Sequence, residues 1–303
     1  MTDAGWQEIA IETQGAAVEA LEDYLFESGA VAVTLLDNAD EPLLEPGPGE
    51  TPLWQNVKVV ALFPMGLDLT DVIAAVPKTL VSHVDDAPTH VPDQDWERAW
   101  MDSFHPMQMG SRLWICPSWT PPPQPDAVNV ILDPGLAFGT GTHPTTAMCL
   151  GQLDALIEPG MRVVDYGCGT GILAIAAVKL GASVAVGVDN DPQAITASKT
   201  NAERNDIDAD RFTVYLPDDF DAAAWQGQAD VVVANILAGP LAQLAPTLKA
   251  LIKPGGYLLL AGLLTDQAQA LVDAYMPELM LFVENELDGW VLLKGQYCVI
   301  PAC

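Results

Sequence analysis

The sequence is poor in basic residues and has no long apolar run. Only 12 of its 303 residues are Lys or Arg, whereas 41 are Asp or Glu, so the formal net charge is −29. This charge repels phosphate backbones and attracts basic partners, which disfavours nucleic acid as a substrate; an acidic surface that serves only solubility is the alternative. No apolar stretch approaches the length of a membrane span, and the N-terminus, with Asp3 and Glu8, lacks the basic region and apolar core of a secretory signal. We therefore expect a cytoplasmic protein that binds no membrane.

Cysteine and histidine are also scarce. The five cysteines are odd in number, include no C-x-x-C pair and are scattered among four isolated histidines. This pattern favours a reduced intracellular protein without a structural metal, because disulfide frameworks and zinc sites need paired ligands. Half of the residues are hydrophobic, which is enough for one large or two ordinary domains with packed cores.

The most informative stretch is VVDYGCGTG at 163–171. An apolar run ends in Asp165 and is followed by three alternate glycines and a helical pattern. This order predicts a strand, a tight loop and a helix, with backbone that can approach a ligand closely at Gly167 and Gly169. Asp189 ends the next predicted strand, where an acid in nucleotide-binding βαβ units accepts hydrogen bonds from ribose hydroxyls. Together these features predict an adenosine site.

The spacing within the loop narrows the choice of ligand. Ile172 stands where a G-x-G-x-x-G dinucleotide fingerprint needs its third glycine, and no Lys follows the glycines as it does in a phosphate-binding Walker loop. An acid followed by G-x-G-x-G, with a second acid at the end of the next strand, is instead typical of enzymes that use S-adenosyl-L-methionine, a cofactor without phosphate. A glycine-rich turn in another kind of α/β protein is the alternative.

Residues 1–90 predict a small α+β domain. The expected order of elements, β-α-β-β-α-β, is that of a ferredoxin-like fold, and nothing in it has catalytic spacing, so we expect a binding or packing role. The expected elements are strands at 6–11, 31–36, 57–63 and 80–84 and helices at 16–28 and 69–76.

Residues 91–125 predict a linker. Its helix, at 93–104, has Trp96 and Trp100 on one face, where core packing is the stronger interpretation and substrate contact the alternative. A short strand at 112–116 and a proline-rich segment complete the linker.

Residues 126–303 predict the catalytic domain, an α/β unit with a Rossmann-like parallel sheet. Strands and helices alternate along it, and Asp288-Gly289 predicts a type I′ hairpin that makes the last strand antiparallel, the usual shape of class I methyltransferases. The expected strands are at 128–132, 163–165, 185–188, 212–216, 231–234, 257–261, 281–287 and 290–294, and the expected helices at 147–156, 172–180, 192–205, 241–251 and 267–275.

Thr146 and Asn235 add polar groups near the ends of these strands. Thr145 and Thr146 come just before the expected helix at 147–156, where hydroxyls and unpaired amides can hold a carboxylate; a plain helix cap is the alternative. Asn235 follows a fully apolar strand and should lie near Asp189, because ligands of open α/β sheets bind at the carboxyl ends of the strands. A turn-forming or capping role is the alternative for Asn235.

Six stretches of the chain carry a resemblance to a known family. They are DWERAWMDSFHP, RLWICPSW, LDPGLAFGTGTHPTT, VVDYGCGTGILAIAA, DPQAI and VVVANILAGPL. With them the chain resembles the bacterial methyltransferases of large-subunit ribosomal protein eleven (L-eleven). The resemblance implies a class I fold, an N-terminal domain that recognises this ribosomal protein, and a linker that allows large reorientation. It also implies a catalytic domain that transfers methyl groups from S-adenosyl-L-methionine to lysine side chains and the N-terminal amine.

The resemblance also implies site residues. The cofactor contacts it implies are Thr146, Gly167, Asp189 and Asn235, and the glycine loop adds Asp165 and Gly169. We expect Asn235 to be catalytic as well, since its uncharged amide cannot abstract a proton but its oxygen can accept hydrogen bonds from an amine and orient the lone pair. His143 is a candidate proton acceptor because histidine titrates near neutrality, with a structural role in its loop as the alternative.

Two other functions fit the same residues. A small-molecule amine N-methyltransferase of the same fold would work without the first 90 residues, whereas a protein methyltransferase should lose its substrate on that truncation. A non-catalytic cofactor-binding protein would bind S-adenosyl-L-methionine and transfer no methyl group.

Overall fold

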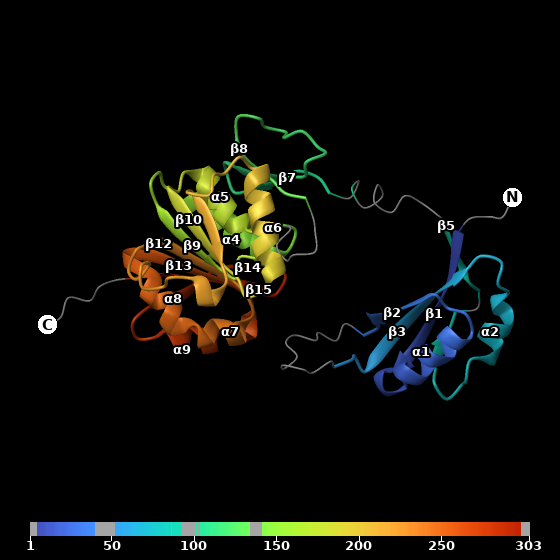
Figure 1. Cartoon of the computed structure of the whole chain (residues 1–303). Helices are drawn as coiled ribbons and strands as arrows, with labels where there is room; N and C mark the ends of the chain where they lie inside the picture. The colour runs from blue at the N-terminus through green and yellow to red at the C-terminus, as the bar shows by residue number, and fades with distance from the viewer. Residues whose placement is uncertain are drawn as a thin grey trace. The chain divides into compact units, whose positions relative to one another are not determined.

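The chain folds as two compact units, Met1–Asp102 and Ser103–Cys303. We analysed a computed structural model, which describes residues 5–39, 52–85, 87–92, 101, 104–133 and 141–297 (Figure 1). The predicted linker, 91–125, spans the division between the two units, and its expected helix with Trp96 and Trp100 lies almost wholly outside the described residues.

The N-terminal unit has the ferredoxin-like fold that the order of its elements predicts. Its sheet has the strand order β2-β3-β1-β4, and all neighbouring strands are antiparallel. Ile9 and Ile11 of β1 are buried, the residues between and beside them are less buried, and the two isoleucines pack with Leu21 and Leu25 of α1 in one core. The elements are β1 (Gly5–Gln14), η1 (Gly15–Ala17), α1 (Val18–Glu27), β2 (Ala32–Asp37), β3 (Asn56–Pro64), α2 (Leu69–Ala75), β4 (His83–Val84) and β5 (Thr89–Pro92).

The second unit is built on a seven-stranded sheet of order β11-β10-β9-β12-β13-β15-β14. The first five of these strands are parallel, and β15 is antiparallel to both of its neighbours, as predicted. Asp288 (φ 52°) and Gly289 (φ 79°) both have positive φ, which confirms the type I′ hairpin. The strands are β9 (Arg162–Tyr166), β10 (Val184–Val188), β11 (Phe212–Tyr215), β12 (Ala229–Asn235), β13 (Ile252–Leu264), β14 (Leu281–Leu287) and β15 (Trp290–Gln296).

Helices cover both faces of this sheet (Figure 1). Val163 of β9 belongs to one hydrophobic core and Val164 to another, because successive side chains of a strand point to opposite faces. The first core includes side chains of α4 (Pro144–Leu156), α5 (Ile172–Leu180) and α6 (Pro192–Arg204) and of a small three-stranded sheet, and the second includes those of α7 (Ala238–Gln243), α8 (Ala245–Leu251) and α9 (Ala268–Tyr275). The small sheet is formed by β6 (Met107–Met109), β7 (Leu113–Cys116) and β8 (Val128–Ile131), and two short 3₁₀ helices are η2 (Pro217–Asp219) and η3 (Thr265–Gln267).

Several expected elements have other bounds in the structure; the strand expected at 80–84, for example, is only His83–Val84. The helix expected at 241–251 is two helices, because Pro246 stands in the first turn of α8 and cannot donate a hydrogen bond to a continuous helix. The expected helix at 147–156 begins three residues earlier, at Pro144, and β13 extends beyond 257–261 at both ends. Within the described ranges, no helix combines the length and the apolar character needed to cross a bilayer.

Candidate active site

A cavity of about 650 Å³ lies at the carboxyl ends of β9, β10 and β12. This is the place where open α/β sheets bind their ligands, and the volume is in the range of small-molecule sites. Of the six predicted site residues, four line the cavity: Gly167, Gly169, Asp189 and Asn235. The other two, Asp165 and Thr146, are buried and do not line it; Thr146 contacts the lining residue Asn235, and Asp165 contacts α5.

The glycine loop after β9 forms one wall of the cavity. Gly167 has φ +80°, and its backbone N–H donates to the Val188 carbonyl of β10 across 2.7 Å. A Cβ at Gly167 would lie 2.1 Å from Cγ2 of Ile236, so no other residue fits without displacing that side chain. Gly169 (φ +53°) donates its N–H to the Asp189 carboxylate, and Gly171 (φ +76°) is the N-cap of α5.

Asp189 is half-buried just after β10 and connects the glycine loop to the loop that leads into α6. Its Oδ2 accepts the Gly169 N–H across 2.8 Å, and its Oδ1 accepts the Asp191 N–H across 3.0 Å. A carboxylate has about four acceptor sites, so Asp189 can still accept hydrogen bonds from hydroxyl groups of a ligand in the cavity.

Asp165 has a supporting position and does not line the cavity. It is fully buried, its Oδ2 accepts the Ala174 N–H of α5 across 3.1 Å, and its Oδ1 has no hydrogen-bond partner among the described residues. Burial, reinforced by the charge of Asp189 and opposed by the Ala174 N–H, raises the pKa of Asp165 to about 7. The carboxyl therefore fixes the start of α5 against the strand that ends in the glycine loop.

Asn235 is the polar group at the end of β12. It is 8% exposed, and its Nδ2 donates to Oγ1 of Thr146 across 3.1 Å. This contact turns the amide so that Oδ1 is left for another donor; Oδ1 is buried and has no partner among the described residues. Thr146 lies inside the first turn of α4 and not just before the helix, as the sequence had suggested, because His143 is the N-cap.

His143 has a structural role at the edge of the cavity. Its Nδ1 accepts the Thr145 N–H across 3.3 Å and lies 2.7 Å from Oγ1 of Thr145, which is the geometry of a helix cap. Burial lowers the pKa of His143, which favours the neutral ring. The ring also packs edge-on against Trp290, with 4.9 Å between the centroids.

Most of the apolar lining could not be identified from the sequence. These side chains are Tyr166, Val188, Pro217, Ile236, Leu237, Pro240, Leu244 and Trp290. The sequence holds one indication of the position of Ile236: Gly262 interrupts an apolar strand. A Cβ at Gly262 would lie 2.4 Å from the Ile236 carbonyl oxygen. A glycine inside a strand often marks a close backbone approach of this kind.

The chemistry of the lining groups suits an adenosine ligand without phosphate. Among the described residues, none that lines the cavity is Lys or Arg, so none of them offers a cationic partner to a phosphate. No group of three or more His, Cys, Asp or Glu side chains suited to holding a metal ion occurs in the ranges that the structure describes.

Comparisons with known proteins agree with this geometry. The family model described as Ribosomal protein L11 methyltransferase (PrmA) matches residues 5–297. The ribosomal protein L11 methyltransferases of Actinobacillus pleuropneumoniae serotype 5b (strain L20) and Pseudomonas aeruginosa (strain UCBPP-PA14) are 51% and 50% identical to this chain, over 96% of it and 98% of each relative. A crystal structure of a ribosomal protein L11 methylase from Lactobacillus delbrueckii subsp. bulgaricus superposes with a TM-score of 0.57 at 30% identity, over 65% of this chain and all of that one. The chain belongs to the ribosomal protein L11 methyltransferase family.

Proposed function

We propose that this enzyme transfers methyl groups from S-adenosyl-L-methionine to amines of ribosomal protein L11, namely lysine side chains and the N-terminal amine. The observation that carries this proposal is Asn235, which lines the cavity together with the glycine loop and Asp189 and whose buried Oδ1 has no hydrogen-bond partner among the described residues. An acceptor without a donor at this place fits an incoming amine, which brings N–H groups to it.

The residues present fit S-adenosyl-L-methionine. When bound, it supplies an electrophilic methyl group on a positively charged sulfur. Asp189 has free acceptor sites for the ribose hydroxyls, and the glycines at 167 and 169 leave room for the ligand against the loop. We propose Thr146 as a further residue of this site that acts by holding Asn235.

The protein must make an amine reactive at neutral pH. A lysine with a pKa of about 10.4 is neutral in only about one molecule in a thousand at pH 7.4, which corresponds to roughly 4 kcal/mol. The apolar lining near Asn235, including Ile236, Leu237 and Leu244, favours the neutral amine by removing water. We propose that Asn235 Oδ1 then accepts an N–H of the amine and directs its lone pair into the cavity, while the proton leaves to solvent before transfer.

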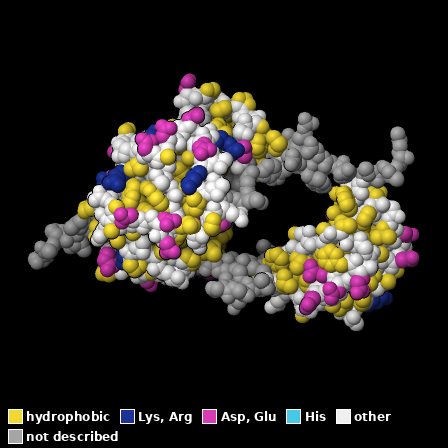
Figure 2. Space-filling view, viewed as in Figure 1, with side chains coloured by type: hydrophobic (Ala, Val, Ile, Leu, Met, Phe, Trp, Pro, Cys, Tyr) yellow, Lys and Arg dark blue, Asp and Glu magenta, His cyan; other side chains and the backbone are white. Residues whose placement is uncertain are grey.

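We assign substrate recognition to the N-terminal unit. It is a ferredoxin-like domain with its own core, and the described residues that line the cavity all belong to the second unit. Asp and Glu outnumber Lys and Arg on the visible face of both units (Figure 2), in keeping with the net charge of −29. This charge favours encounter with a basic ribosomal protein, and we place the reaction in the cytoplasm, where such proteins are made.

Incubation with tritiated S-adenosyl-L-methionine and ribosomal proteins from cells that lack the enzyme tests the proposal. We expect one labelled band, the size of L11, and loss of that label when residues 1–90 are removed from an enzyme that still binds the cofactor. Label that persists on a small amine after the truncation would favour a small-molecule N-methyltransferase instead. Cofactor binding without any transfer would favour a non-catalytic binding protein.

A further inference from the structure

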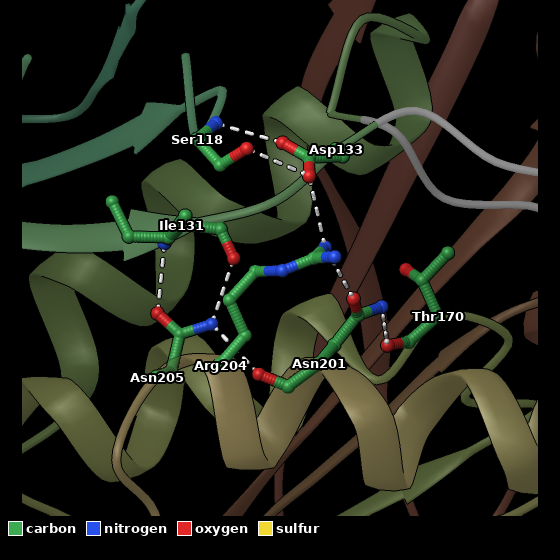
Figure 3. A network of polar contacts seen from close by, with 7 residues as sticks. All are labelled: Ser118, Ile131, Asp133, Thr170, Asn201, Arg204 and Asn205. Atoms are coloured by element: carbon green, nitrogen blue, oxygen red, sulfur yellow. Dashed lines mark hydrogen bonds and ion pairs between the residues drawn. The ribbon is translucent and has the colours of Figure 1, made fainter. Parts of the chain in front are cut away.

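A line of polar contacts connects the glycine loop to the end of β8 (Figure 3). On α6, Nδ2 of Asn201 donates to the Thr170 carbonyl across 2.9 Å, and Oδ1 of the same amide accepts from Nη1 of Arg204 across 3.4 Å. The Arg204 Nη1 also lies 3.3 Å from Oδ2 of Asp133, two residues beyond the end of β8. None of these side chains lines the cavity.

The far end of this line is itself fixed. Ser118 donates to Asp133 twice, from its backbone N–H to Oδ1 across 2.7 Å and from its Oγ to Oδ2 across 2.9 Å. Beside it, Asn205 holds the last residue of β8: its Oδ1 accepts the Ile131 N–H across 2.8 Å and its Nδ2 donates to the Ile131 carbonyl across 2.7 Å. Asp133 thus holds Arg204 against a rigid segment of the small sheet.

The near end of the line lies in the cofactor loop. Ser198, one turn before Asn201 on α6, donates its Oγ to the Gly169 carbonyl across 2.9 Å. Two successive carbonyls of the loop, those of Gly169 and Thr170, are therefore held by side chains of one helix, while the Gly169 N–H is held by Asp189. A rotation of the peptide at Thr170 would move Gly169, which lines the cavity.

Burial decides which contacts water can replace. Thr170 is 3% exposed and Asn201 7%, whereas the side chains of Arg204 and Asp133 are 34% and 22% exposed. Water can partly substitute for the outer ion pair, which limits its contribution. The inner bond from Asn201 to the Thr170 carbonyl lies where water has little access, so water compensates less for its loss.

We propose that Asn201 and Arg204 are positioning residues for the cofactor: Asn201 holds the Gly169-Thr170 backbone in its binding conformation, and Arg204, fixed by Asp133, orients the Asn201 amide. The proposal rests on the proposed function, since it assigns these residues to the site for S-adenosyl-L-methionine. It predicts that the affinity for the cofactor depends on two side chains that do not touch it.

Four variants and two controls test this inference. Because a single lost hydrogen bond corresponds to about 0.5–1.5 kcal/mol, we expect Asn201→Ala to raise the Kd of S-adenosyl-L-methionine by about tenfold and Arg204→Met or Asp133→Asn by about threefold. Arg204→Lys should restore most of the affinity. Glu203→Gln on the same helix and Asp126→Asn before β8 make the same change in charge as Asp133→Asn at exposed positions and should leave Kd unchanged.

The measurements separate positioning from general stability. In steady-state assays, the KM for the cofactor should follow Kd, while kcat at saturation and the KM for the protein substrate stay within about twofold, because the lost bonds act on the loop and not on the transferred group. In the ligand-free protein, amide hydrogen exchange at 169–171 should be faster in Asn201→Ala than in the wild type. Combining Arg204→Met with Asp133→Asn should weaken binding no more than either change alone.

The inference would be overturned if Asn201→Ala had the same amide hydrogen-exchange rates and the same Kd as the controls. Additive effects of the Arg204 and Asp133 changes on Kd would overturn it as well. If the wild type binds no S-adenosyl-L-methionine at all, the proposed function fails. The exchange rates at 169–171 still decide whether Asn201 holds the loop.

Discussion

Nδ2 of Asn235 lies 3.1 Å from Oγ1 of Thr146 and joins the end of β12 to the first turn of α4. The two residues are 89 positions apart in the chain, yet both are buried and each limits the orientation of the other. The contact leaves Oδ1 of Asn235 as a buried acceptor without a partner among the described residues, on a residue that lines the cavity together with the glycine loop and Asp189. Most of the predictions below follow from this arrangement and from the loop beside it.

Removing the Asn235 amide should impair transfer more than cofactor binding. Asn235→Ala deletes the acceptor proposed to orient the amine, and loss of one such oriented group typically lowers kcat by about 10²-fold or more. Thr146→Ser keeps the hydroxyl and should lower kcat far less. If Asn235→Ala changes neither kcat nor the Kd of S-adenosyl-L-methionine, the amine site is elsewhere.

Neutralising Asp189 should weaken cofactor binding. Hydrogen bonds to a charged group contribute about 1.5–3 kcal/mol, so we expect Asp189→Asn to raise Kd by about 10- to 100-fold in calorimetry. Asp210→Asn makes the same change in charge at an exposed position and should leave Kd unchanged. Equal affinities for the two variants would contradict the assigned ribose contact.

Gly167→Ala separates steric conflict from backbone strain. Gly167 (φ +80°) and Gly255 (φ +82°) have nearly the same positive φ, but a Cβ at Gly255 meets nothing within 4 Å, whereas one at Gly167 lies 2.1 Å from Ile236. Both variants should lose about 1–2 kcal/mol of unfolding free energy through strain, and Gly167→Ala about 1–3 kcal/mol more through overpacking. Denaturant titration measures the difference, and similar losses for both variants would show that the loop can move away from Ile236.

The buried carboxyl of Asp165 should make stability depend on pH. Its pKa is raised in the fold from 3.8 to about 7, so its contribution to stability is fully present below about pH 4, is lost as the pH rises toward 7 and changes no further above that. Asp165→Asn cannot ionise at this position. As the pH rises from about 4 to about 7, its free energy of unfolding should therefore increase relative to that of the wild type, by up to about 1.4 kcal/mol per pH unit. A difference between the two proteins that does not change with pH would mean that Asp165 keeps an ordinary pKa.

Salt should stabilise the protein. With 12 basic and 41 acidic residues, repulsion among like charges opposes the compact state, and screening at about 1 M sodium chloride shortens the Debye length to about 3 Å. We expect Tm to rise with sodium chloride and to change much less with an uncharged osmolyte at the same osmolality. A Tm that falls with salt would indicate that attractive ion pairs, such as Arg204 with Asp133, outweigh the repulsion.

The sequence predicted the parts of the fold that depend on local patterns. The glycines after Asp165, the apolar run before Asn235 and the Asp288-Gly289 turn each determine a local conformation, and the strands and turn they predicted are present. The short strand β5 was not predicted, because only its pairing with β1 defines it. The helix expected at 241–251 is interrupted because Pro246 overrides its apolar periodicity.

The candidate site also has a part that the sequence predicts and a part that it does not. Gly167, Gly169, Asp189 and Asn235 follow strand ends that are recognisable in the sequence, and they meet because parallel strands end at one edge of a sheet. Long-range contacts carry no such local signal. Trp290 reaches the cavity from the far hairpin, and the line of polar contacts from Asp133 to the loop depends on packing between segments distant in sequence.

The most direct test is mass spectrometry of purified, unmethylated ribosomal protein L11 after incubation with the enzyme and S-adenosyl-L-methionine. We predict that the wild type adds whole methyl groups to lysine side chains and the N-terminal amine, and that Asn235→Ala, with cofactor binding largely retained, adds them far more slowly. L11 whose mass does not change with the wild-type enzyme, or equal rates for the two enzymes, would contradict the account.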